Sequence, residues 1–389
     1  MHRLALLVAA ILAQPLAAAA PAPMLPPYTA AYEPQTVDER GLWMEADEQE
    51  RQLRDSPLRI RDAGLDAYVR GVICRAVGAE RCVGVRVYVM EVPAFNASMR
   101  PNGAMVVWSG LLLRVRDEGE LAAVLGHEFA HFELRHGLRG FQARRGVTDV
   151  MAWLTVLGGI SNTPTANTQL LLAGSLFRFT RDQESEADSL GLRYLAASGY
   201  PATSAPALWR SVMGEDDARA IDRGQKPRQR YTAGFFDDHP TSLKRATDLA
   251  AEAAKLPPGG DARADAYRNA IAPFLPRLLA AQVKLNDFGG TDYILNHLAT
   301  TGGGWSAELL HARADLYRSR GNPRDLQIAG GLYREARAAG YAAADLDRDL
   351  GLALMRNSQT DEARQALTAY LAAAPNASDA QAIAALIAP

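Results

Sequence analysis

Apolar residues recur at helical spacing along much of this chain. A charged stretch over residues 37–55 predicts one helix, and a second helix begins at Asp62, with apolar residues three and four positions apart. Residues 118–136 fit a single helix. A further helix over residues 183–198 ends at Gly199, which a proline follows two positions later. These segments predict a mainly α-helical protein.

Two strands are predicted between residues 85 and 108. Valines alternate with other side chains over residues 85–90, which is the pattern of a half-buried strand. A Pro-Asn-Gly turn follows at residues 101–103, and residues 104–108 form the second strand candidate. Residues 214–238 are polar, contain glycines and lack apolar periodicity, so we expect a mobile loop there.

The clearest domain boundary is the Pro-Pro-Gly-Gly-Asp sequence at residues 257–261. We expect residues 21–256 to form an α+β domain with a small β-sheet, and residues 262–389 to form a helical domain. In the second domain, the segment around Tyr370 matches a tetratricopeptide unit, and a segment around Tyr333 resembles it at an offset of 37 residues. Stacked repeats of this kind form a concave surface for protein partners. An irregular helical bundle stays an alternative, because the first units are degenerate.

Residues 1–20 have the pattern of a secretory signal peptide. Arg3 supplies a basic start, an apolar stretch follows over residues 4–12, and small residues precede Pro21. The apolar stretch is shorter than the roughly 20 residues that span a bilayer. The pattern predicts export to a periplasm or the cell exterior, with cleavage after Ala19. An uncleaved N-terminal anchor helix is the alternative.

The chain has two cysteines, Cys74 and Cys82, and both follow the predicted signal. In an oxidising compartment, the short loop between them can close as a disulfide. A pair of buried thiols is the alternative, whereas a zinc knuckle is disfavoured because no histidine is near.

Charge and composition exclude several classes of protein. The chain has 42 basic and 44 acidic residues among 389, which argues against nucleic-acid binding through bulk charge. With 48% hydrophobic and 22% charged residues, it has the composition of a soluble globular protein. Two apolar pieces, residues 150–160 and 170–177, are each too short to span a bilayer. We expect a helical hairpin there, with peripheral membrane contact as the weaker alternative.

The candidate chemistry lies in the sequence His-Glu-Phe-Ala-His, which begins at His127. His127 and His131 are four residues apart, so both imidazoles project from one face of a helix and can bind one zinc ion. Glu128 lies beside them, where it can take a proton from water at the metal. The segment therefore predicts a metallopeptidase helix.

A third metal ligand must come from another segment. The metzincin spacing is absent, because Leu134 and Gly137 stand where that class has Gly and His. His136 falls one position short of that spacing. We expect it to support the helix end or a ligand imidazole rather than to bind zinc.

The better source of a third ligand is the acidic start of the helix at 183–198. Glu184 and Asp188 share one face of that helix, so Glu184 can complete the site while Asp188 orients a ligand imidazole. Glu186 lies about 200° around the helix from Glu184, so both cannot face the metal. A solvated acidic face is the alternative.

Three motifs in this order resemble those of the gluzincin metallopeptidases of family M48, the Ste/HtpX/Oma type. They are the His-Glu-Phe-Ala-His helix, the Glu-x-Glu-Ala-Asp-x-x-Gly segment at 184–191, and Asp238-His239-Pro240 with Arg245. The resemblance covers roughly residues 38–255. It implies a gluzincin-type fold with one zinc ion per chain, held by His127, His131 and Glu184. It further implies that Glu128 is catalytic and that Asp188 supports a ligand.

The same resemblance implies roles for two more residues. Asn96 would lie on the edge strand where the family binds substrate backbone, and an extended peptide can add there as a strand. His239 would lie near the metal, where it either caps the zinc or stabilises the oxyanion. Asp238 stands where the family usually has Ser or Thr, and a loop-capping role for His239 is the alternative. Arg245 is expected to be a structural ion-pair partner.

These observations together predict an exported zinc endopeptidase that cleaves protein substrates in envelope protein quality control. The arrangement of a protease domain and helical repeats is similar to that of exported members of the family, and the repeats would bind envelope protein partners. The alternative is a periplasmic chaperone-like or scaffold protein that binds partners through its repeats and has a capped zinc site.

Overall fold

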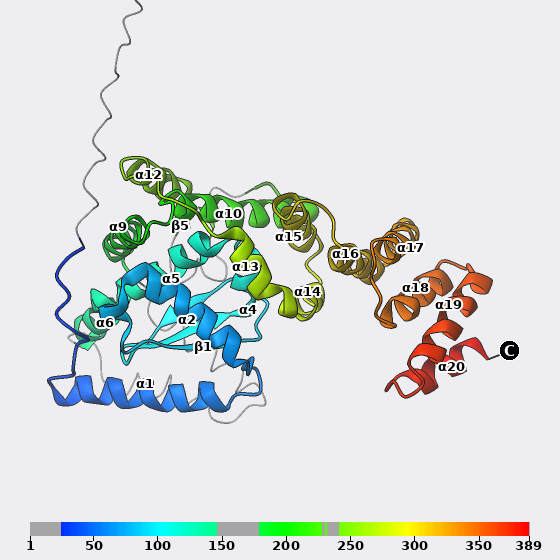
Figure 1. Ribbon diagram of the computed structural model, residues 1–389, viewed down its shortest axis with the longest axis horizontal. Coiled ribbons are helices and arrows are strands. Elements are labelled where there is room, and N and C mark those ends of the chain that lie inside the picture. The colour runs from blue at the N-terminus through cyan, green and yellow to red at the C-terminus, as the bar shows by residue number, and fades with distance from the viewer. Residues whose placement is uncertain (1–24, 146–178, 228–229, 232–240, 389) are drawn as a thin grey trace, which may run out of the picture.

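The computed structural model describes residues 25–145, 179–227, 230–231 and 241–388 (Figure 1). The predicted signal peptide, the apolar pieces between residues 150 and 177, and His239 lie outside these residues. Within the described ranges, no helix combines the length and the apolar character needed to cross a membrane. The predicted fold class is confirmed: the chain is mainly helical, with a small sheet and a helical C-terminal region.

A three-stranded sheet has the strand order β1-β3-β2. The predicted strands are β1 (Arg86–Met90) and β3 (Ala104–Trp108), which run parallel, and β2 (Ala97–Met99) pairs antiparallel with β3 at one edge. The sequence pattern missed β2, which has only three residues. The predicted turn between β2 and β3 is present, and Gly103 adopts a φ of 91° there.

The prediction that β1 is half-buried was wrong, because helices cover both faces of the sheet. On one face lies α1 (Val37–Asp55), and its Leu53 packs with the side chains of one face of β1 and β3, namely Tyr88, Met90, Ala104 and Val106. The other face lies in the main hydrophobic core with the helices α2 (Ala63–Val77) and α5 (Glu118–Glu133) (Figure 1). The valines of β1 therefore alternate with side chains that are buried on the opposite face.

The predicted disulfide between Cys74 and Cys82 is present. It joins α2 (Ala63–Val77) to the short helix α3 (Ala79–Cys82), with the two Cα atoms 5.1 Å apart. The start of α2 is also as predicted, since the side chain of Asp62 accepts a hydrogen bond from the backbone N–H of Leu65 at 2.8 Å.

The prediction of one helix over residues 118–136 was wrong at its end. After α4 (Ser109–Arg114), helix α5 spans Glu118–Glu133, and α6 (His136–Arg145) begins three residues after it ends. The break lies at Arg135, whose φ of 57° is left-handed and cannot continue an α-helix. The apolar pattern hid this corner because one helix follows the other almost at once.

The predicted loop over residues 214–238 was also wrong in its first part. Residues 214–222 are the second half of α10 (Ser204–Asp222), which follows α9 (Arg181–Ser198). Glu215 is buried, and it accepts hydrogen bonds from Arg114 at 2.6 and 2.8 Å and from Arg219 at 2.8 Å. Glu215 is thus paired inside the protein instead of being solvated, and its partner Arg219 also pairs with Asp216.

The remaining elements of the described ranges are helical except for the pair β4 (Arg230–Tyr231) and β5 (Thr241–Ser242). They are α12 (Leu243–Ala253), α13 (Ala264–Ile271), the 3-10 turn η2 (Ala272–Phe274), α14 (Leu275–Val283), α15 (Phe288–Thr301), α16 (Ala307–Arg320), α17 (Pro323–Ala338), α18 (Asp345–Arg356), α19 (Thr360–Ala373) and α20 (Ala380–Ile387). The main core continues past residues 257–261, since it includes side chains from Ile60 to Leu316. The last helices, α17 to α20, extend away from the sheet (Figure 1).

A buried histidine joins α16 to α18 in this C-terminal region. The Nε2 atom of His311 lies 3.6 Å from Asp349, its Nδ1 atom lies 3.7 Å from Asp315, and its ring stacks on Tyr341 at 4.2 Å. Burial lowers the pKa of His311, but the carboxylates of Asp349, Asp315 and Asp345 raise it more, so this pKa lies above its ordinary value. The protonated imidazole therefore stabilises the contact between α16 and α18.

Candidate metal centre

Helices α5 and α9 cross at the site, and caps define where each begins. The side chain of Asp117 accepts a hydrogen bond from the N–H of Glu120 at the start of α5, and Thr180 forms a capping box with Gln183 at the start of α9. Small residues let the two helices approach. A Cβ atom on Gly191 of α9 would lie 3.5 Å from the backbone nitrogen of His127, which is van der Waals contact, so the backbones of the two helices lie close together here.

The crossing brings three metal-binding side chains together in the protein interior. The Nε2 atoms of His127 and His131 lie 3.1 Å apart, and the carboxylate of Glu184 spans both, at 3.6 Å from His127 and 3.5 Å from His131. All three side chains are buried, and one donor atom from each lies within 4.8 Å of the others. Zinc–ligand bonds of about 2.0–2.1 Å in a tetrahedral site place donors roughly 3.3 Å apart. The observed donor set therefore fits one tetrahedral metal ion.

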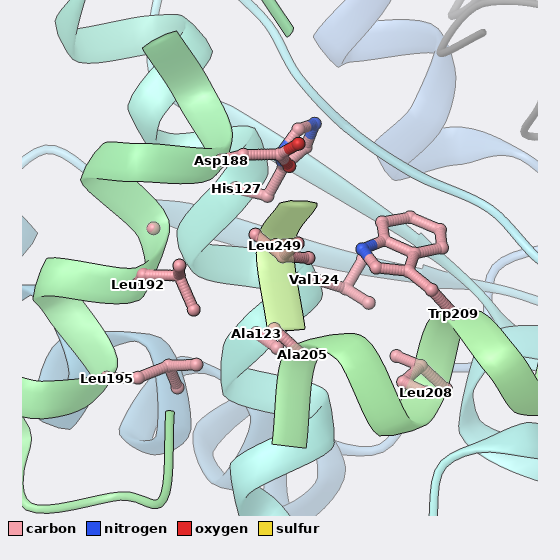
Figure 2. Close-up of a pocket in the computed structure, with 11 residues that line it drawn as sticks. Ala123, Val124, His127, Asp188, Leu192, Leu195, Ala205, Leu208, Trp209 and Leu249 are labelled. Atoms are coloured by element: carbon pink, nitrogen blue, oxygen red, sulfur yellow. The ribbon is translucent and has the colours of Figure 1, made fainter. Parts of the chain in front are cut away.

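Asp188 supports the first of these histidines. Its Oδ1 atom lies 3.1 Å from Nδ1 of His127, on the side of the ring opposite Nε2. Figure 2 shows the two side chains together at one end of a pocket lined by apolar residues of α5, α9, α10 and α12. The indole of Trp209 lies edge-on to the His127 ring, with the ring centroids 6.4 Å apart. The carboxylate and this apolar packing fix the orientation of His127.

The second histidine, His131, has a different set of neighbours. Phe179 stacks on its ring with the centroids 3.8 Å apart, and His136 lies 2.9 Å away, Nδ1 to Nδ1. The Nε2 atom of His136 lies 3.0 Å from Glu186, whose side chain is 51% exposed. Burial lowers the pKa of His136 below its ordinary value despite the opposing effect of Glu186. His136 and Glu186 thus lie behind the cluster of donor atoms and not within it.

The other predicted site residues are placed as follows. Glu128 is on α5 beside His127 and is buried. Asn96 immediately precedes β2, and its backbone oxygen accepts a hydrogen bond from the N–H of Trp108 at 3.0 Å, which extends the pairing of β2 with β3. His239 lies outside the described residues. Phe179 and Trp209 were not identified from the sequence, because an isolated aromatic residue carries no motif.

Comparison with known proteins shows that this chain is similar to a family of peptidases. The model of peptidase family M48 matches residues 60–253. The mitochondrial metalloendopeptidase OMA1 of Schizosaccharomyces pombe is 30% identical over 184 residues, which are 46% of this chain and 50% of that protein. The putative beta-barrel assembly-enhancing protease of Vibrio cholerae is 28% identical over 233 residues, 57% of this chain and 46% of that protein.

A shorter relative matches as well. The metalloprotease LoiP of Escherichia coli is 30% identical over 158 residues, which are 40% of this chain and 57% of that protein. The chain thus spans about half the length of the curated relatives it matches. The matched segment contains every described residue of the donor cluster.

Proposed function

Residues 60–253 of this chain belong to peptidase family M48, and on this premise we propose that the protein is an exported zinc endopeptidase that cleaves protein substrates. The observation that carries the proposal is the buried cluster of His127, His131 and Glu184, whose donor atoms fit one tetrahedral ion. Two imidazoles and one carboxylate form the donor set of zinc peptidases, which leaves one position for water or substrate. Asp188 holds His127 by its other ring nitrogen.

The reaction then needs a base and an acid next to the metal. Zinc, when bound, supplies a Lewis acid that polarises the scissile carbonyl and makes nearby water more acidic. Glu128 follows His127 in α5 and is buried. We assign to it the transfer of a proton from the attacking water to the leaving amine.

The substrate backbone is proposed to bind along β2. In the described part of the sheet, β2 pairs with β3 alone and lies at the edge. Helix α5, which carries the donors His127 and His131, packs against β2. An extended peptide that pairs with β2 and Asn96 would therefore run past the donor cluster.

The proposal also includes the compartment in which the protein acts and the proteins that it binds. The signal-like pattern of residues 1–20 supports export, and the disulfide between Cys74 and Cys82 suits an oxidising compartment. The helix pairs α16–α17 and α18–α19 support a repeat domain, because Tyr333 and Tyr370 occupy corresponding buried positions in them. We propose that these repeats, placed at residues 262–389, bind envelope proteins, and that the enzyme acts in their quality control.

Replacing Glu128 with Gln tests the proposed activity. The wild-type protein loaded with zinc should cleave β-casein, and Glu128→Gln should lower kcat by about 10²–10⁴-fold while the zinc content stays near one per chain. Glu252→Gln on the exposed face of α12 is the matched control and should leave cleavage unchanged. Proteomics of the exported fraction should show full-length proteins that accumulate in the Glu128→Gln strain. Wild-type protein that binds zinc but cleaves nothing would instead favour the alternative binding function.

A second comparison tests the donor set. Glu184→Gln should greatly reduce bound zinc, whereas Glu186→Gln should leave it nearly unchanged, because Glu186 contacts His136 rather than the metal and a glutamine keeps an oxygen that can accept the hydrogen bond from His136. Equal loss of zinc in the two variants would contradict the assignment of Glu184.

A further inference from the structure

We propose that His136 is a positioning residue for the metal site, which holds the ligand His131 through a hydrogen bond between the two imidazole rings. The inference rests on the proposed zinc site and adds to it the group that orients the second histidine. His127 already has such a group, Asp188, whose carboxylate lies 3.1 Å from its Nδ1 atom. At the equivalent nitrogen of His131, Nδ1, the imidazole of His136 lies at 2.9 Å.

The positions of the ring nitrogens define the direction of this hydrogen bond. The Nε2 atom of His131 faces His127 and Glu184, so it is the nitrogen that binds the metal. Its Nδ1 atom then carries the proton, as in other metal-bound imidazoles, and donates to Nδ1 of His136 at 2.9 Å. His136 accepts at Nδ1, and therefore its own proton is on Nε2.

Glu186 fixes that tautomer of His136. Its Oε2 atom lies 3.0 Å from Nε2 of His136 and accepts the hydrogen bond that this N–H donates. The same oxygen lies 3.3 Å from the guanidinium of Arg139 on the next turn of α6. Two hydrogen bonds thus run from the ligand through a buried imidazole to a carboxylate at the surface, where Glu186 is 51% exposed.

The fold leaves His136 little freedom to move. Its side chain is fully buried, and it is the first residue of α6, directly after the left-handed Arg135. The guanidinium of Arg135 lies 4.2 Å from the ring centre of Tyr32, and this contact stabilises the turn between α5 and α6. Phe179 stacks on the other ring of the pair, His131. Packing therefore holds the acceptor nitrogen of His136 in place.

Removing the acceptor takes away the hydrogen bond that Nδ1–H of His131 donates to His136, and the orientation of the His131 ring is then less well fixed. Loss of such a supporting contact weakens metal binding by about 10–100-fold in other sites. The His136→Phe variant retains a ring of similar size but has no nitrogen. The His136→Asn variant retains an acceptor, because its amide oxygen can take the place of Nδ1.

The dissociation constant for zinc, measured by competition with a chromogenic chelator, tests the proposal without any assay of peptidase activity. His136→Phe should weaken binding by about 10–100-fold, Asp188→Asn by a similar factor, and His136→Asn should restore most of the affinity. Cobalt in place of zinc should show a changed absorption spectrum in His136→Phe, and a spectrum near the wild type in His136→Asn. In the zinc-loaded wild type, ¹⁵N NMR should find His136 protonated at Nε2 and unprotonated at Nδ1. His297→Phe on α15, which lies outside the donor cluster, is the control and should leave zinc affinity unchanged.

Wild-type affinity in His136→Phe would overturn the proposal, even if its apoprotein were less stable, because His136 would then serve packing alone. Zinc loss as complete as in Glu184→Gln, with no rescue by Asn, would also overturn it, since His136 would then be a ligand. If His136→Phe does not fold, Glu186→Ala at the surface replaces it and should weaken zinc binding by a smaller factor; unchanged affinity there would count against the relay. Wild-type protein that binds no zinc would instead refute the proposed function, so the two failures are distinguishable.

Discussion

Replacing Glu215 with Gln should destabilise the folded protein by about 3 kcal/mol, the lower end of the cost of breaking a buried ion pair. Glu215 and Arg114 are 5% and 6% exposed, and the carboxylate accepts hydrogen bonds from Arg114 at 2.6 and 2.8 Å and from Arg219 at 2.8 Å. A glutamine of the same shape removes the charge and one acceptor. The expected cost lies at the lower end because Arg114 still donates to the backbone oxygen of Gly110 at 2.9 Å.

The assay is thermal unfolding followed by circular dichroism, on protein treated with a chelator so that binding of the proposed metal does not contribute to stability. A loss of about 3 kcal/mol in the free energy of unfolding should lower Tm by about 6–12 °C for a domain of roughly 150–250 residues. The matched control is Glu91→Gln, which breaks a pair with Arg277 of α14 at 2.7 Å whose side chains are 27% and 50% exposed. It should cost less than about 1 kcal/mol. Equal shifts in Tm for the two variants would refute the argument that burial sets the cost.

Four further outcomes are expected. Gly110→Ala should destabilise the protein by about 1–3 kcal/mol in urea unfolding, because its Cβ would overlap the backbone oxygen of Ala94, whereas Gly71→Ala on an open helix face should not destabilise it. Cys82→Ser should cost about 2.5 kcal/mol under oxidising conditions and nothing in reductant, since the disulfide closes a short loop. Because the pKa of His311 is raised, its protonated imidazole stabilises the C-terminal helices fully at pH values below about 6.5, the ordinary histidine pKa. The Tm of these helices should therefore fall as the pH rises above that value, and His311→Phe should abolish this dependence of Tm on pH. His239→Ala should raise peptide cleavage if His239 caps the zinc, or lower kcat by about 10²-fold if it stabilises the oxyanion, and unchanged kcat would contradict both roles.

Local patterns predicted those elements whose signals lie within a few residues. The helices over 37–55 and 181–198 and the strand over 104–108 agree with prediction, since periodicity and caps are local. The spacing of His127 and His131, and of Glu184 and Asp188, likewise predicts which side chains share a helix face. The structure shows that the two faces meet.

The wrong predictions concern segments whose secondary structure depends on contacts with distant parts of the chain. Residues 214–222 looked like a loop because the partner of Glu215, Arg114, lies about a hundred residues earlier in the chain. The end of α5 depends on the left-handed Arg135, a residue type that does not itself signal a stop. The contact of His136 with His131 follows from that corner, so it could not be read from helical spacing.

The continuous core has a consequence for the order in which this protein can become active. Tyr267 of α13 is buried and donates a hydrogen bond to the backbone oxygen of Leu112, and the core that surrounds α5 extends to Leu316 of α16. A chain synthesised only as far as residue 256 has the whole metal-binding sequence, but it lacks these side chains. The helix that carries His127 and His131 therefore completes its surroundings only after most of the chain has emerged, so the proposed peptidase site would be assembled late in synthesis.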